Sequence, residues 1–318
     1  MSRAVVDPAA MATDSAPTGA EGGGRNLVSG TPVLLLAFAA GLGYMWLDFD
    51  ALIHWRAPFF PRQSADFRLW LLFYGIQVSI WTASLWVTSR PVRDLWRSQD
   101  AAARWSASLA LAIAALLAFA VVLYRPDDVE KAMPFSTVPQ QDSKGVAQIL
   151  ALSAAAFPML GIALHRGIGR RLAGLEPLDR SPLLLEAQRQ SREWLGWVGT
   201  IIGAGTLGSG ALRRAMLAAS GNQPGLFPVE EVVGYGLAFS FLVAVVYFPT
   251  ARALEQAAAG IRDALLPAEG TAEDWFKARK EWDERLGIGA DFGKSLTTGI
   301  GILGPLIGAL LAQALPGK

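Results

Sequence analysis

The chain contains seven stretches of 16 to 20 residues without a charged side chain. They are Pro32–Leu47, Leu69–Thr88, Trp105–Tyr124, Val146–His165, Trp194–Leu212, Val232–Thr250 and Leu296–Leu315. An uncharged apolar run of about 18 residues matches the thickness of a bilayer's hydrocarbon core. A single Asp, Lys or Arg at the centre of such a run opposes insertion by about 2.5–3.5 kcal/mol. We therefore predict an all-α, polytopic transmembrane bundle of seven spans, or six if Leu296–Leu315 does not cross.

The composition excludes several classes of site. Hydrophobic residues make up 52% of the chain and charged residues 17%, whereas about a quarter of a typical soluble protein is charged. The absence of cysteine excludes disulfides, thiolate nucleophiles and Cys-ligated metals. The two histidines, His54 and His165, lie far apart, so we expect no metal and no cofactor. No run of Lys and Arg interleaved with aromatic residues indicates a nucleic-acid partner.

The polar residues within the predicted spans are uncharged. They include Gln77, Ser79, Thr82, Gln148, Ser153, Thr200, Thr206, Ser240 and Gln313. His165 ends the fourth span beside Arg166, where we expect the membrane interface. Ion-coupled transporters and retinal proteins need ionisable residues inside their spans. The sequence also has no Walker loop, HExxH or GxSxG motif. We therefore expect a protein without enzymatic activity.

Basic residues are divided unequally between the two sides of the predicted bundle. Nineteen Lys and Arg residues lie in the N-terminal tail and the connections after the second, fourth and sixth spans, and nine lie on the opposite side. Because cytoplasmic loops carry the excess of Lys and Arg, we predict a cytoplasmic N-terminus in the cell (inner) membrane and a C-terminus on the opposite side. The predicted parts are a disordered tail (1–30), a six-span bundle (31–250), a cytoplasmic helical segment (251–295) and a Gly-rich membrane segment (296–318).

Glycines are spaced for close helix packing in the fifth and seventh predicted spans. Gly199 and Gly203 form a GxxxG step, Gly208 follows, and Gly304 and Gly308 repeat the pattern. The G-x-G-x-x-G string that ends at Gly208 is not a dinucleotide motif here, because that motif requires a strand before it and a helix after it. Small residues let membrane helices approach closely. The glycines therefore indicate either packing within one chain or self-association into a homo-oligomer.

Two predicted spans continue as helices beyond the membrane. Leu183–Glu193 has no helix breaker before the fifth span, and Ser181 followed by Pro182 is typical of a helix start. The sixth span is expected to run on through Arg252–Leu266, with Pro249 as a kink.

A separate short helix is predicted to follow. Thr271–Asp274 has the spacing of a capping box, and Trp275, Trp282 and Leu286 then recur at near-heptad spacing. This apolar stripe allows three interpretations: an interfacial helix in the inner leaflet, a docking face for a cytoplasmic protein, or packing against the protein's own cytoplasmic side.

We expect the protein to lie in the lipid bilayer, and three functional hypotheses follow. The first is a self-associating bundle that forms a channel or perturbs the membrane, assembled through the Gly-rich spans. The second is a facilitator for a neutral or lipid-like solute, since an uncharged interior suits uncharged cargo. The third is a scaffold or sensor that recruits a protein partner through its cytoplasmic helices.

Overall fold

A computed structural model of the protein describes residues 65–123, 141–219, 229–266 and 271–288, together with Leu36, Ala39, Gly41 and Gly43. No strand occurs among these residues. The helices are α2 (Ala65–Ser98), α3 (Ala101–Leu123), α5 (Gln141–Leu164), the 3₁₀ turn η2 (His165–Gly167), α6 (Ile168–Leu172), α7 (Pro177–Ala219), α8 (Val229–Leu265) and α9 (Ala272–Leu286).

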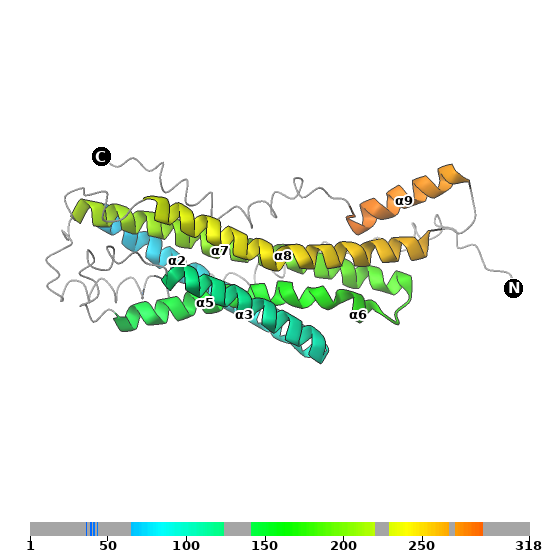
Figure 1. Ribbon diagram of the computed structural model, residues 1–318, viewed down its shortest axis with the longest axis horizontal. Helices are drawn as coiled ribbons and strands as arrows, with labels where there is room; N and C mark the ends of the chain where they lie inside the picture. Colours follow the sequence, from blue (N-terminus) through cyan, green and yellow to red (C-terminus); the bar gives the residue numbers. More distant parts are fainter. Residues whose placement is uncertain are drawn as a thin grey trace.

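The long helices form an elongated up-and-down bundle (Figure 1). Helices α2, α5 and α8 run in one direction and α3 and α7 in the other, so the ends of α2, α6 and α8 lie at the same end of the bundle. Helix α5 packs against α2, α3, α7 and α8, and α7 packs against α2, α5 and α8. Helices α5 and α7 are therefore the centre of the described bundle.

Large apolar side chains cover the outside of the peripheral helices. They recur every three or four residues on α3 at Trp105, Leu109, Ile113 and Leu116, and on α8 at Leu237, Phe241, Val245 and Phe248. Exposed apolar surface of this extent is typical of an interaction surface or a membrane protein. Four described helices are long and apolar enough to cross a bilayer, at Ala65–Ser98, Leu150–Leu172, Pro177–Ala215 and Val232–Leu265, and Ala101–Leu117 is a shorter apolar helix.

These findings confirm an all-helical bundle with apolar helices compatible with membrane insertion, but not the count of seven spans. The first predicted span is described at four residues, which are helical, and Gly41 lies so close to α2 that a Cβ there would overlap Ser79. The seventh, Leu296–Leu315, lies outside the described residues, as does the tail 1–30.

Two helices are much longer than a bilayer requires. Helix α7 has 43 residues and α8 has 37, which correspond to about 65 Å and 55 Å at 1.5 Å per residue. The hydrocarbon core is about 30 Å thick. The predicted continuation of the fifth and sixth spans is therefore confirmed, and α8 runs through residue 250, the expected end of the bundle, without a break.

The predicted start of the longest helix was wrong. Helix α7 begins at Pro177, and Pro182 lies inside it. Ser181 donates a hydrogen bond to the carbonyl of Pro177 at 3.5 Å instead of capping the helix. Both prolines are compatible with an early helical position, where the missing N–H costs least, and the earlier one begins the helix.

The ends of α7 and α8 have an apolar core of their own. It consists of Ile168, Leu172, Leu184, Ala187, Leu254, Ala258, Ile261 and Leu286. These residues come from α6, residues 177–193 of α7, residues 251–265 of α8, and α9, and we call this group the helical extension. A second apolar core shows that the helices are held together beyond the bundle.

Candidate functional site

A buried amide links α2 to α7 inside the bundle. The side-chain nitrogen of Gln77 donates a hydrogen bond to the carbonyl of Ala204 at 3.0 Å. A Cβ on Gly208 would overlap this amide. Glycine at position 208 therefore makes room for a contact within one chain.

The described residues include two of the other four predicted packing glycines. Gly199 is buried and Gly203 is half-buried, both on the central helix α7. Gly304 and Gly308 lie outside the described residues. Self-association through these glycines stays a prediction.

A second cross-helix bond compensates for a proline. Pro158 lies inside α5 and has no N–H to donate to the carbonyl of Ala154 one turn earlier. The hydroxyl of Ser84 on α2 donates to that carbonyl at 3.0 Å, and both residues are buried. The neighbouring helix therefore supplies the donor that the proline removes.

The same arrangement occurs between η2 and α8. Pro249 leaves the carbonyl of Val245 without its helix donor, and a guanidinium nitrogen of Arg166 donates to it at 3.5 Å. One residue later, the hydroxyl of Thr250 donates to the carbonyl of Ile162 at 3.1 Å. Gln77, Ser84 and Thr250, together with Arg166, thus act as cross-links between helices.

The 3₁₀ turn η2 lies where the bundle meets the helical extension. The ring of His165 is buried and stacked on Trp194, with ring centroids 5.3 Å apart. A Cβ on Gly161 would lie 2.5 Å from the Trp194 ring, and one on Gly167 would lie 3.3 Å from Gln99. Glycines before and after His165 therefore let this turn pack closely against α7 and against the turn between α2 and α3. The sequence predicts a membrane interface at His165, and the structure shows that protein encloses its ring.

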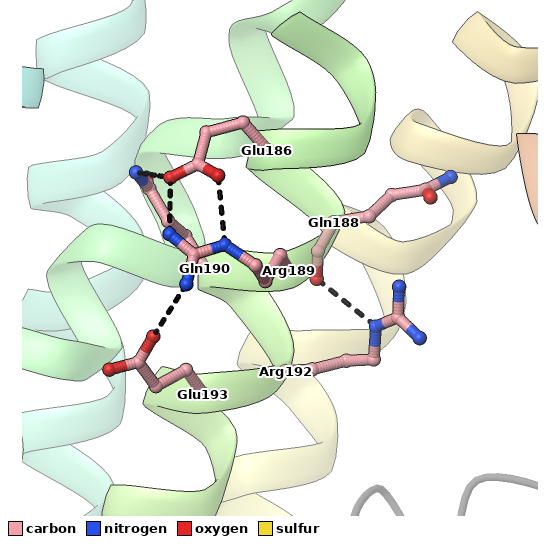
Figure 2. A network of polar contacts seen from close by, with 6 residues as sticks. All are labelled: Glu186, Gln188, Arg189, Gln190, Arg192 and Glu193. Atoms are coloured by element: carbon pink, nitrogen blue, oxygen red, sulfur yellow. Dashed lines mark hydrogen bonds and ion pairs between the residues drawn. The ribbon is translucent and has the colours of Figure 1, made fainter. Parts of the chain in front are cut away.

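The outer face of α7 beyond this turn carries a polar network (Figure 2). The Glu186 carboxylate accepts two hydrogen bonds from Arg189, each of 2.8 Å, and one from Gln190 of 2.7 Å. Arg189 also lies 3.8 Å from Glu193. All these partners are three or four residues apart on one helix, so the network stabilises α7 and does not form a site between helices.

Helix α9 begins at the predicted capping box. The Thr271 hydroxyl accepts a hydrogen bond from the Asp274 backbone N–H at 3.2 Å and donates to the Asp274 carboxylate at 2.6 Å. The hydrogen bonds that the hydroxyl and the backbone N–H of Thr271 donate to the Asp274 carboxylate lower the pKa of Asp274 below its ordinary value. The helix ends at Gly287, whose φ of 65° suits glycine. The predicted start of this helix is confirmed.

The C-terminal half of α9 is attached to the helical extension. Leu286 is 1% exposed within the apolar core, and Trp282 packs against that core. The guanidinium of Arg262 on α8 lies 2.8 Å from the carboxylate of Asp283, and the side chain of Gln188 on α7 donates to the carbonyl of Leu286 at 3.1 Å.

The N-terminal half of α9 carries an exposed phenylalanine next to a half-buried tryptophan. Phe276 is 65% exposed and meets Trp275 edge to face, with centroids 5.3 Å apart. The guanidinium of Arg279 lies 5.2 Å above the Trp275 ring. The predicted stripe is thus divided, because Trp282 and Leu286 pack inward while Trp275 lies beside an exposed phenylalanine.

Sequence reasoning missed Phe276 and the anchoring pair of Arg262 and Asp283. Phe276 is off the near-heptad stripe, and its only sequence indication is its position next to Trp275. The ion pair joins residues 21 positions apart, and no spacing rule predicts such a contact.

The chain has no match among protein-family models, curated proteins or solved structures. Within the described ranges, no group of three or more His, Asp or Glu side chains could hold a metal ion. The half of α9 that carries the exposed Phe276 is the candidate functional site.

Proposed function

We propose that the protein is a membrane-embedded scaffold that presents α9 as a docking helix for a cytoplasmic protein partner. The observation that supports this proposal is the division of α9 into two halves. Its C-terminal half is fixed by Leu286 and by the ion pair between Arg262 and Asp283, while Phe276 is exposed on the other half and lies beside the half-buried Trp275. Tryptophan, tyrosine and arginine are enriched among the residues that dominate binding energy at protein interfaces, and α9 places Arg279 over the ring of Trp275.

The position of α9 favours a protein partner over the lipid surface. Helix α8 continues for 15 residues past Thr250, the predicted end of the sixth span, or about 22 Å at 1.5 Å per residue. Only residues 266–271 connect it to α9, so the first turn of α9 lies near that far end, as Figure 1 shows. Trp275 and Phe276 are therefore well beyond the predicted membrane boundary.

The charges of α9 support the same choice. Ala272–Leu286 carries five acidic and four basic side chains, whereas interfacial helices typically have a polar face rich in Lys and Arg. A helix of mixed charge gains little attraction to anionic lipid. It suits a protein surface with both signs of charge.

Photo-crosslinking in native membranes tests the proposal. A photoreactive residue at position 276 should give an adduct of protein size that is lost in Trp275→Ala. The same residue at position 178 is the control, because Leu178 on α7 is also exposed in the helical extension. Lipid adducts at position 276, or the same protein adduct at both positions, would contradict the docking function.

The other two functional hypotheses have less support. Gly208 makes room for the Gln77 amide of the same chain, so it is used for packing within one chain. Self-association is therefore tested at Gly203, by measuring the oligomeric state of Gly203→Leu. A facilitator for neutral solutes needs free polar groups along a route, but Gln77 and Ser84 are engaged in cross-helix bonds.

A further inference from the structure

Arg166 is a cation without a carboxylate partner in the described part of the chain. Its guanidinium makes a long hydrogen bond of 3.5 Å to the carbonyl of Val245. Its Nε is buried and has no hydrogen-bond partner among the described residues. By contrast, Arg170 on the same side of the bundle lies 3.2 Å from the carboxylate of Asp100. A guanidinium has five donors, and the hydrogen bond to Val245 uses one of those on Arg166.

The sequence around Arg166 is basic. No acidic residue occurs between Asp142 and Glu176, while Arg166, Arg170 and Arg171 lie within six residues. The positive charge of η2 and α6 is therefore not balanced by their own segment. An anion from outside the chain would find favourable electrostatics there.

An apolar stripe on α8 leads to the same point. Leu237, Phe241, Val245 and Phe248 are exposed on one side of this helix, and Arg166 donates to the carbonyl of Val245 within the stripe. Arg252 follows Phe248 by one helical turn and is exposed. One face of α8 thus offers an apolar strip that ends at two cations, Arg166 and Arg252.

We propose that Arg166 binds the phosphate of an anionic phospholipid whose acyl chain lies along this stripe of α8. A guanidinium recognises a phosphate with two parallel hydrogen bonds. Basic positions between transmembrane helices near the cytoplasmic surface are typical sites for anionic headgroups. The acyl chain would cover the apolar stripe, and the phosphate would pair with the unbalanced guanidinium. This proposal is independent of the docking function of α9.

The test compares the full-length protein in nanodiscs of phosphatidylcholine with and without phosphatidylglycerol. We expect phosphatidylglycerol to raise the thermal stability of the wild type and of Arg189→Gln, which loses only ion pairs on the outer face of α7. Arg166→Gln should bind the anionic lipid about fivefold more weakly, the effect expected of one basic residue near a membrane surface. An unchanged response of Arg166→Gln to phosphatidylglycerol would overturn the proposal.

Two further measurements distinguish a lipid from a soluble anion and cover the case in which Arg166→Gln does not fold. Inorganic phosphate added to the phosphatidylcholine nanodiscs should not raise the thermal stability. If free phosphate stabilises the protein as much as phosphatidylglycerol does, the ligand of Arg166 is a soluble anion and the lipid proposal is wrong. If Arg166→Gln does not fold, a photoactivatable phosphatidylglycerol is added to the wild type. Adducts on residues 237–248 or 165–167 would support the site, and adducts confined to other segments would exclude it.

Discussion

The contact between Gln77 and Gly208 gives a quantitative test of the bundle. In Gly208→Ala the new methyl group would occupy the position of the Gln77 amide, which must move away from the carbonyl of Ala204. Cross-helix hydrogen bonds in membrane proteins contribute about 0.6 kcal/mol on average and about 1.7 kcal/mol at most. A buried amide left without a partner costs about 1–3 kcal/mol. We therefore expect Gly208→Ala to reduce the free energy of unfolding by about 1–2 kcal/mol.

The change should be harmless when the amide is absent. In the Gln77→Ala background the methyl group at position 208 meets no amide, and alanine has a helix propensity about 1 kcal/mol better than glycine. The cost of Gly208→Ala should then fall to about zero. The coupling energy of this double-mutant cycle is expected to be about 1–2 kcal/mol.

The assay is the free energy of unfolding measured in mild detergent for the two single variants and the double variant. Gly205→Ala is the matched control, because a Cβ on Gly205 of the same helix would meet nothing within 4 Å. It should leave stability unchanged or raise it. Equal costs of Gly208→Ala with and without Gln77 would refute the proposed contact between α2 and α7.

Two further changes test the other local contacts. Ser84→Ala leaves the carbonyl of Ala154 without a donor and should cost about 1–2 kcal/mol of unfolding free energy, whereas Thr82→Ala, whose hydroxyl bonds within its own helix, should cost less. Because the pKa of Asp274 is lowered in the folded protein, its contribution to the start of α9 is present above the unfolded pKa of about 3.9. That contribution is lost as the pH falls through the pKa of Asp274 in the folded protein. We therefore expect hydrogen exchange in the first turn of α9, corrected for intrinsic rates, to accelerate below about pH 4 in the wild type. It should not accelerate in Thr271→Ala.

The elements were predictable where a local rule decides the structure. The charge-free stretches 69–88, 146–165, 194–212 and 232–250, and residues 105–123 of the stretch 105–124, lie on described helices or end in η2. A long uncharged apolar run is by itself typical of a helix that can cross a bilayer. The start of α9 was predictable because a capping box involves neighbours three residues apart. The start of α7 was not, since Pro177 and Pro182 both satisfy the same rule.

The contacts between helices were not predictable, because they depend on the register of segments far apart in the sequence. Ser84 and Ala154 are 70 residues apart, and Gln77 and Ala204 are 127 apart. A serine or glutamine in an apolar run indicates a cross-helix bond in general. It does not identify the partner helix or the carbonyl that accepts.

The use of polar groups inside the bundle bears on where function lies. Several polar side chains of the spans are committed to structure, since Gln77 and Ser84 donate to carbonyls of neighbouring helices and Thr250 bonds α8 to α5. If such a side chain bonded a solute instead, the carbonyl that it now serves would be buried without a hydrogen bond, which is unfavourable. By contrast, the Phe276 ring is exposed and donates no hydrogen bond to a neighbouring helix, and Arg166 uses only one guanidinium nitrogen for its contact with the Val245 carbonyl. We therefore propose recognition at the helical extension and at η2, while the polar groups inside the bundle hold its helices together.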